Sequence, residues 1–205
     1  MIEAQSITKI YNQESVVEDF NIAIKPGDFI SLTGESGSGK TTILNMLGLL
    51  VKPDEGNLII EDIANPTPKQ TMLLHRHTFG FLFQNYALIE NETVADNLEI
   101  AMGYQKKIDK KSKMKEALEF VKLRNVMDKK IYQLSGGEQQ RVALARLYIK
   151  EAKYILADEP TGNLDLKNRD IVFELLKDLN NAGKAVVYVT HDMELANRAN
   201  RRIDI

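Results

Sequence analysis

Residues 34–41 of this chain, Gly34-Glu35-Ser36-Gly37-Ser38-Gly39-Lys40-Thr41, decide its fold class. They match the pattern G-x-x-x-x-G-K-[ST], follow the apolar run Phe29 to Leu32 and precede the apolar stretch Ile43 to Leu50. A strand, a glycine-rich loop and a helix in this order let backbone N–H groups face a polyphosphate, while Lys40 reaches its terminal phosphates and Thr41 can ligate Mg²⁺. An ordinary glycine- and serine-rich turn would explain the loop alone, so the sequence predicts a nucleotide site.

Two more apolar runs, Tyr154 to Ala157 and Ala185 to Val189, are continuous in the same way. Continuous runs of this length are typical of strands buried on both faces of a parallel sheet. The segment Phe20 to Ile24 instead alternates apolar and polar residues before Pro26-Gly27, and Leu58 to Ile60 is similar. These two segments are predicted to be half-buried strands.

Helical periodicity lies between the strands. An apolar face from Val94 to Met102 follows a Thr93/Asp96 capping pattern, and a second face from Val172 to Leu179 precedes Gly183, the predicted C-cap. Because strands and helices alternate along the chain, the expected fold class is α/β.

The composition is that of an ordinary globular protein, with 205 residues of which 43% are hydrophobic and 27% charged. This length predicts one large domain and excludes a second full domain. The 27 basic and 29 acidic residues leave a net charge of -2, so no basic field indicates nucleic acid as a partner. The absence of cysteine excludes a disulfide framework and a thiolate metal site.

No segment has the pattern of a membrane span. The most apolar stretch, Ile43 to Val51, is interrupted by Asn45 and Gly48 and is far shorter than the roughly 18 to 20 residues that a span requires. The N-terminus lacks the basic start and apolar run of a signal peptide, so we expect a cytoplasmic protein.

Residues 86–150 contain no convincing strand pattern and are interpreted as a helical insertion into the α/β core. Within it, six lysines fall between Lys106 and Lys115. A nucleic-acid patch is one interpretation of this run. A solvated helix face is favoured because acidic residues flank it and no aromatic residue interleaves beyond Tyr104.

A second chemical element is the acidic pair Asp158-Glu159 at the end of the apolar run Tyr154 to Ala157. Such a pair by itself is commonly just a solvated strand end. Downstream of a phosphate loop, however, an acid at the tip of a buried parallel strand lies where such sheets bind ligands. Asp158 is therefore predicted to hold Mg²⁺ and Glu159 to orient or deprotonate an attacking water.

The third element is Leu134-Ser135-Gly136-Gly137-Glu138-Gln139-Gln140-Arg141. A serine and two glycines at a helix start present a hydroxyl and bare N–H groups to an anion, although Ser-Gly-Gly alone could be a plain N-cap. The whole stretch resembles the signature motif of the ABC ATPases, and other motifs of that family appear in order between Tyr11 and His191. In this resemblance Ser135, Gly136, Gly137 and Glu138 belong to the nucleotide-binding surface.

The remaining assignments follow from the resemblance. Tyr11 corresponds to the aromatic residue that stacks on adenine, and Gln84 to the Q-loop glutamine that senses Mg²⁺ and the attacking water. Asp165 in Gly162-Asn163-Leu164-Asp165 corresponds to the D-loop, and His191 to the switch histidine that contacts the γ-phosphate. His75 and His77 match no motif of the family and are weak evidence for a metal site.

The resemblance implies a P-loop NTPase fold with a mainly parallel core sheet, an antiparallel β subdomain and an inserted helical subdomain at about residues 86–150, all within one domain of residues 1–205. The segments Phe83 to Glu90 and Pro160 to Asp165 resemble the lipoprotein-release and macrolide-exporter subgroup, and within it the bacteriocin-export ATPases. Because many relatives continue past the last strand, a C-terminal regulatory domain is expected to be absent.

The resemblance further implies a bacterial transporter subunit that hydrolyses ATP with Mg²⁺ and works on a separate integral membrane permease at the inner face of the plasma membrane. Two copies are expected to form a homodimer. ATP would be held by Lys40, Thr41, Thr42, Gln84, Asp158 and His191 of one copy and by Ser135 and Gly137 of the other. The catalytic group is expected to be Lys40, Gln84, Glu159 and His191.

Two other functions stay open at this point. One is a soluble ABC ATPase of DNA repair or translation, although such relatives carry long insertions for which 205 residues leave no room. The other is an ATPase that drives a membrane signalling or cell-wall complex without transport, which the sequence does not separate from export.

Overall fold

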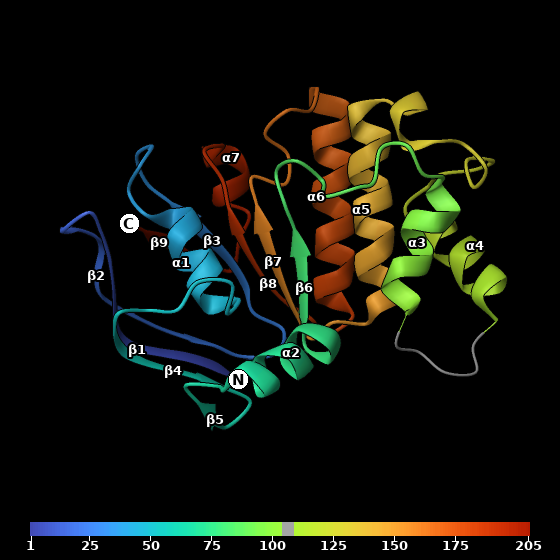
Figure 1. Ribbon diagram of the computed structural model, residues 1–205. Helices are drawn as coiled ribbons and strands as arrows, with labels where there is room; N and C mark the ends of the chain where they lie inside the picture. Colours follow the sequence, from blue (N-terminus) through green and yellow to red (C-terminus); the bar gives the residue numbers. More distant parts are fainter. Residues whose placement is uncertain (104–108) are drawn as a thin grey trace.

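Two β-sheets organise the residues that this computed structural model describes, 1–103 and 109–205 (Figure 1). The larger sheet has the order β6-β7-β8-β3-β9, and every neighbouring pair in it is parallel. Its strands are β6 (Phe79–Leu82), β7 (Tyr154–Asp158), β8 (Ala185–Val189), β3 (Phe29–Thr33) and β9 (Arg201–Asp204). The three continuous apolar runs are therefore the three central strands, as predicted.

The smaller sheet is antiparallel and has the order β2-β1-β4-β5. Its strands are β2 (Glu14–Ile24), β1 (Ile2–Tyr11), β4 (Glu55–Ile60) and β5 (Ile63–Ala64). The strands expected around 20–24 and 58–60 are part of it. Strand β1 escaped the sequence pattern because its pairing with β2 shifts between Ala4 and Ile7, where Ser6 has a φ of +49°, and this interrupts the two-residue alternation.

Helix α1 (Lys40–Leu47) packs between the two sheets, and its buried side chains share one apolar cluster with both of them. The helix ends at Leu47, earlier than the expected Leu50. Gly48 caps it at a very close approach, because a Cβ at Gly48 would lie 2.5 Å from Cε1 of Phe81 and 2.7 Å from Cδ1 of Leu156. Strand β6 thus packs tightly against the end of α1.

The remaining helices are α2 (Pro68–His77), α3 (Val94–Met102), α4 (Lys110–Phe120), α5 (Gly136–Lys150), α6 (Leu166–Asn181) and α7 (Met193–Ala196), with a 3₁₀ turn at Ile131–Gln133. The capping box predicted at Thr93 and Asp96 starts α3. Helix α6 has its C-cap at Ala182 rather than at Gly183, which follows it with a φ of +90°. The glycine therefore supplies the left-handed residue just past the helix.

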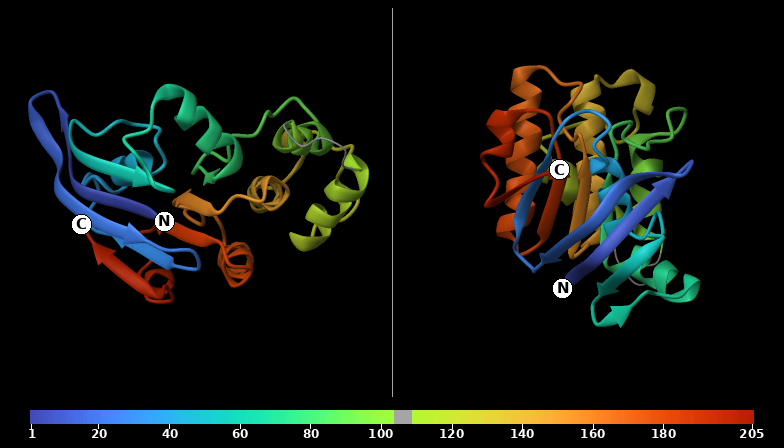
Figure 2. Two further views of the ribbon diagram at one scale, coloured as in Figure 1. Left: turned by 90° about the horizontal axis from the view of Figure 1, so that it is seen from below. Right: turned by 90° about the vertical axis from the view of Figure 1, so that its left-hand side faces the viewer.

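Seen from below, the antiparallel sheet and helices α3 and α4 lie at opposite ends of the molecule, with the parallel sheet between them (Figure 2). Helix α5 packs on α3, α4, α6 and β6, so one apolar cluster runs from the helical segment into the sheet. Within the described part of 86–150, no residue belongs to a β-strand of either sheet. Lys106 and Lys107 of the lysine run lie outside the described residues, whereas Lys110, Lys111 and Lys115 are exposed on α4.

None of the helices in residues 1–103 and 109–205 combines the length and the apolar character needed to cross a bilayer.

Candidate nucleotide-binding site

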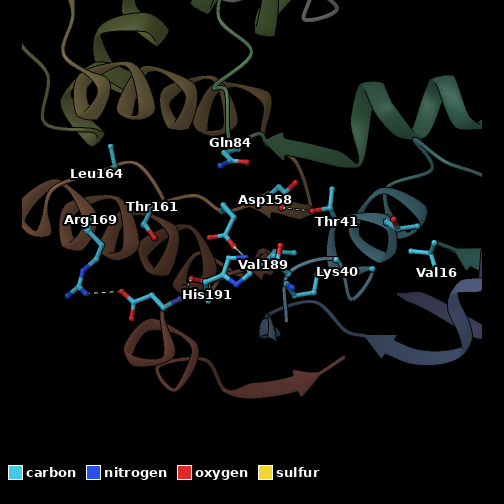
Figure 3. A pocket seen from close by; sticks show the side chains of 18 of the residues that line it. Val16, Lys40, Thr41, Gln84, Asp158, Thr161, Leu164, Arg169, Val189 and His191 are labelled. Carbon is cyan, nitrogen blue, oxygen red and sulfur yellow. Dashed lines mark hydrogen bonds and ion pairs between the residues drawn. The ribbon is translucent and has the colours of Figure 1, made fainter. Parts of the chain in front are cut away.

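A cavity of about 640 Å³ lies beside the N-terminal end of α1 and the carboxyl ends of β7 and β8 (Figure 3). Its volume is in the range that small-molecule sites have. The residues that were expected in the site and line this cavity are Ser36, Gly37, Gly39, Lys40, Thr41, Thr42, Gln84, Asp158, Glu159 and His191. They come from four separate stretches of the chain, which the parallel strand order brings to one edge of the sheet.

The loop before α1 has the geometry of an anion cradle. Gly39 has a φ of +91°, and a Cβ there would lie 2.6 Å from the carbonyl oxygen of Val16, so the position requires glycine. Helix α1 then begins without a side-chain cap and without an acidic residue in its first turn. Its first N–H groups and the positive end of its dipole therefore favour a negatively charged ligand.

Lys40 supplies the cation of this loop. Its side chain is buried, with 5% of the residue exposed. Its Nζ donates to the carbonyl oxygen of Gly34 at 3.1 Å, to that of Glu35 at 2.5 Å and to Oγ of Ser38 at 3.4 Å. Gly34, Glu35 and Ser38 therefore contribute through the lysine that they hold rather than by lining the cavity.

Thr41 and Asp158 bring two oxygen ligands together across 117 residues of sequence. The Thr41 hydroxyl donates to Oδ1 of Asp158 at 3.1 Å. Burial raises the pKa of Asp158, while the hydrogen bond from Thr41 and the charges of Lys40 and His191 act in the opposite direction. A hydroxyl next to a carboxylate suits a hard cation such as Mg²⁺. Within the described residues, no cluster of three or more His, Cys, Asp or Glu side chains could hold a metal ion.

Glu159 and His191 form the second polar pair. Glu159 has a φ of +45°, which is strained backbone for a residue with a side chain. Its Oε1 lies 3.2 Å from Nε2 of His191 but forms no hydrogen bond with it, and this buried oxygen has no hydrogen-bond partner in the described part of the chain. Burial raises the pKa of Glu159, and the nearby His191 partly opposes that effect. Glu159 lines the cavity, so the arrangement leaves a carboxylate acceptor at the cavity wall.

Gln84 follows β6 and reaches the cavity wall (Figure 3). The residues after it turn sharply, since Tyr86 has a φ of +62° and Ala87 a φ of +47°. Arg146 of α5 donates to the carbonyl oxygens of both residues at 2.6 Å, and burial lowers the pKa of Arg146 to about 10. The segment that carries Gln84 is thus anchored to α5.

Residues Ser135 to Glu138, called here the signature-like tip, lie at the start of α5 and do not line the cavity. Ser135 is the N-cap, and its hydroxyl donates to the carboxylate of Glu138 at 2.8 Å, while the Ser135 N–H donates to the same carboxylate at 2.9 Å. These bonds hold the pKa of Glu138 below its usual value. Ser135 and Gly136 are exposed, and Gly137 packs so closely on Asn168 that a Cβ would lie 2.5 Å from its Cγ. The tip therefore faces solvent in one chain.

Tyr11 is also absent from the cavity lining. It ends β1 with 45% of its surface exposed, and the Nζ of Lys9 lies 5.3 Å from its ring centroid. Val16 of β2 lines the cavity instead. Asp165 likewise lies outside the lining and caps α6, where its carboxylate accepts the N–H of Asn168 at 3.0 Å.

His75 has a structural role. Its Nε2 lies 2.8 Å from the carbonyl oxygen of Gly48, and its ring packs edge-on against Phe79 and Phe81. His77 ends α2.

Sequence reasoning missed part of the lining, namely Val16, Thr161, Gly162, Leu164, Leu166, Arg169, Val189, Thr190 and Asp192. Several of these are adjacent in sequence to predicted residues: Leu164 and Leu166 flank Asp165, and Thr190 and Asp192 flank His191. That adjacency could have indicated that they lie near the site. Arg169 had no such signal, because nothing in its local sequence shows that it faces a strand end.

The chain is similar to several known proteins. The model of a protein family described as "ABC transporter" matches residues 17–162. A lipoprotein-releasing system ATP-binding protein, LolD of Aquifex aeolicus, is 37% identical over all of this chain and 93% of its own length. The macrolide export ATP-binding/permease protein MacB of Hyphomonas neptunium is 36% identical, and this chain spans only 33% of its length.

A solved structure of the ABC transporter cassette MJ0796, described as dimeric, has a TM-score of 0.91 and 38% identity. A second structure of the same cassette, described as a dimeric post-hydrolysis state bound to ADP and Pi, has the same TM-score and 36% identity. Each comparison covers 100% of this chain and 94% of the solved one.

Proposed function

The chain belongs to the ABC transporter family. We propose that it is an ATP-hydrolysing subunit that drives a membrane permease, and that the residues of its cavity bind and hydrolyse the nucleotide. The observation that carries this proposal is the convergence in one cavity of the Lys40 loop, the Thr41–Asp158 contact and the Glu159–His191 pair. These are the three parts that phosphoryl transfer to water needs: a phosphate cradle, a metal position and a group that orients water.

Nucleotide binding is the first step. The Lys40 ammonium is held inside the loop by the carbonyl oxygens of Gly34 and Glu35, and there it can donate to phosphate oxygens. The uncapped N–H groups of α1 bind the same phosphates, and Ser36, Gly37, Gly39 and Thr42 complete the cradle.

Mg²⁺ fits beside this cradle, because Thr41 and Asp158 present a hydroxyl and a carboxylate at 3.1 Å from each other. Thr41 and Asp158 would hold the ion, with Gln84 as the third contributor on the cavity wall. When bound, the ion neutralises charge on the phosphates. Burial raises the pKa of Asp158 more than Thr41, Lys40 and His191 lower it, and a cation bound beside the carboxylate would favour its ionised form.

Glu159 is the general base in this proposal. Its Oε1 is buried and has no hydrogen-bond donor among the described residues, so it can accept a proton from a water in the cavity. Burial raises its pKa, which makes it a better proton acceptor than an ordinary glutamate. The Nε2 atom of His191 lies 3.2 Å from that oxygen. In this proposal His191 orients Glu159 and contacts the terminal phosphate.

The exposed signature-like tip needs a second chain. Ser135, Gly136, Gly137 and Glu138 form a capped helix start outside the cavity of their own chain, and Ser135 and Gly136 in it are exposed to solvent. We assign it to the nucleotide of a second copy, so that two cavities each close with the tip of the other chain. The dimeric state of the MJ0796 cassette, a similar protein, supports this arrangement.

The remaining assignments concern the whole complex. Residues 1–205 form one ATPase domain with a helical subdomain at about 86–150, and Tyr11 and Asp165 belong to the closed nucleotide site rather than to the open cavity. The chain works at the inner face of the plasma membrane on an integral membrane permease of an exporter. The names of the relatives MacB and LolD, which concern macrolide export and lipoprotein release, support the exporter assignment.

Tethered dimers test the shared site. Lys40→Ala and Ser135→Arg are placed either on opposite chains, where both changes affect one site, or on the same chain, where each site carries one change. We expect ATP retention at one intact site in the first arrangement and none in the second. A retention that is equal in both arrangements would show that Ser135 does not serve the partner's nucleotide.

Phosphate release from Mg-ATP tests the catalytic assignment in the same preparations. Lys40→Ala should reduce turnover by about a hundredfold or more, because one preorganised charge at the transferring phosphate is typically worth several kcal/mol. Lys177→Ala is the matched control, since Lys177 is an exposed lysine on α6 outside the cavity. Near-normal turnover in Lys40→Ala would refute the assignment. Vesicles that contain the permease would test export separately.

A further inference from the structure

Arg169 is a cation of the nucleotide cavity that does not contact the phosphate loop. It lies in the first turns of α6 and lines the cavity, with only 15% of its side chain exposed. Its Nη1 donates to Oδ2 of Asp192 at 2.8 Å and its Nη2 to Oε2 of Glu194 at 3.2 Å. The guanidinium also binds Asp170 of its own helix at 3.0 Å, and it thus joins α6 to the turn that follows β8, where His191 lies.

Asp192 divides its two oxygens between two tasks. Oδ1 accepts the N–H groups of Glu194 at 2.9 Å and Leu195 at 3.2 Å and so caps α7. Oδ2 is bound by Arg169. The Asp192 N–H donates to Oγ1 of Thr190, the residue that precedes His191, at 3.1 Å. Both neighbours of His191 in the chain are thus held by hydrogen bonds.

The imidazole of His191 has little support from its contact with Glu159. His191 is half-exposed, with 55% of its side chain accessible, and its Nε2 lies 3.2 Å from Oε1 of Glu159 without hydrogen-bond geometry. Helix α7 has only four residues, so it has little stability of its own and cannot fix the turn without tertiary contacts. The hydrogen bond from Arg169 to Asp192 is one of those tertiary contacts, and it holds the residue that directly follows His191.

A second ion pair joins the same two parts of the fold. Arg198, just after α7, binds Glu174 of α6, and its guanidinium lies 4.3 Å from the ring centroid of Phe173. This pair is one to two turns farther along α6 than Arg169 and does not involve a residue adjacent to His191. Loss of the Arg169–Asp192 contact would therefore leave α7 attached to α6. It would loosen mainly residues 190–192, the turn that carries His191.

From this geometry we propose that Arg169 is a positioning residue that sets the orientation of His191 by holding Asp192. The inference rests on the proposed role of His191 in hydrolysis and adds a residue that does not itself touch the reacting atoms. Arg169 acts on the rate of the chemical step, and the strength of nucleotide binding is independent of it.

Steady-state ATP hydrolysis and nucleotide binding test this inference in four variants. Arg169→Ala and Asp192→Asn, which keeps an oxygen for the α7 cap, should each lower kcat about tenfold, because a misplacement of about 1 Å can cost up to a hundredfold. KM for Mg-ATP should stay within about twofold of the wild type. Arg169→Lys should recover part of the loss, since lysine can still bind one carboxylate. Glu174→Gln, the matched control, should retain wild-type kcat.

The same changes in the His191→Ala background give the decisive comparison. If Arg169 acts through His191, Arg169→Ala should cause no further loss of kcat there. A further loss of similar size in that background would overturn the inference while His191 keeps its role. A raised KM with unchanged kcat would overturn it as well, because Arg169 would then be a nucleotide contact.

If His191→Ala alone leaves turnover unchanged, the proposed role of His191 fails and the inference fails with it. This result differs both from a further loss of kcat in the His191→Ala background and from a raised KM with unchanged kcat. Thermal unfolding of each variant separates these results from loss of structure. Should Arg169→Ala not fold, Asp192→Asn and Arg169→Lys carry the same comparison.

Discussion

Replacing Glu61 with glutamine tests how the two sheets are held together. Glu61 lies in the turn between β4 and β5 of the antiparallel sheet. Its carboxylate accepts hydrogen bonds from Lys153 at 2.7 Å, from the Tyr154 hydroxyl at 2.5 Å and from the Met1 amino group at 2.8 Å. Because Tyr154 begins β7, this cluster ties the antiparallel sheet to the parallel sheet that forms the nucleotide cavity.

The size of the effect follows from the pKa of Glu61. The hydrogen bond from Lys153, followed by those from the amino group and Tyr154, lowers this pKa from 4.5 to about 2. At about 1.4 kcal/mol for each pKa unit, the difference sets an upper bound of about 3.5 kcal/mol on the stabilisation by the ionised group. Lys153 is 62% exposed and Glu61 28%, so solvent weakens the cluster. We expect Glu61→Gln to cost about 2 kcal/mol.

The pH dependence gives a sign that can be checked. Since the pKa is lower in the folded state, the stabilisation is fully present above about pH 4.5 and is lost as the pH falls toward 2. Urea unfolding of wild type and Glu61→Gln should therefore show a gap of about 2 kcal/mol at pH 7 and less than half of it at pH 3.

Glu55→Gln is the control for this experiment, because Glu55 is an exposed glutamate at the other end of β4. It should change stability by less than about 0.5 kcal/mol. Equal stability of Glu61→Gln and wild type at pH 7 would refute the argument, and so would a gap that widens on acidification.

Three further changes test the site itself. Glu159→Gln should nearly stop hydrolysis while Mg-ATP still binds. Because burial raises the pKa of Glu159, wild-type turnover should begin to fall at a higher pH than an ordinary glutamate would give, and a pH–rate profile that stays flat down to pH 4.5 would contradict the general-base role. Tyr11→Ala should weaken ATP binding by about 1 to 3 kcal/mol by calorimetry if Tyr11 stacks on adenine, whereas Tyr11→Phe should not. Arg146→Ala removes two bonds to the Tyr86 and Ala87 carbonyls and should cost about 2 kcal/mol, with faster amide exchange around Gln84; unchanged exchange there would refute the anchoring.

Local features of this protein were readable from the sequence because each is encoded in a short, contiguous stretch. The phosphate loop, the three central strands and the Thr93 and Ser135 caps all depend on neighbouring residues, and the structure has each of them where the pattern predicts it. Strands β1, β6 and β9 were missed for physical reasons: β1 is interrupted by bulges, β6 has four residues with Gly80 among them, and β9 is a polar edge strand.

Only the tertiary structure decided which distant side chains meet. The strand order β7-β8-β3 brings Asp158 to Thr41 and Glu159 to His191, although 117 and 32 positions separate these pairs in the chain. The same order places Arg169 against Asp192, which no local pattern indicates. The reason is that a periodic pattern specifies an element and its buried face, whereas the neighbours of each strand end follow from how the strands are arranged in the sheet.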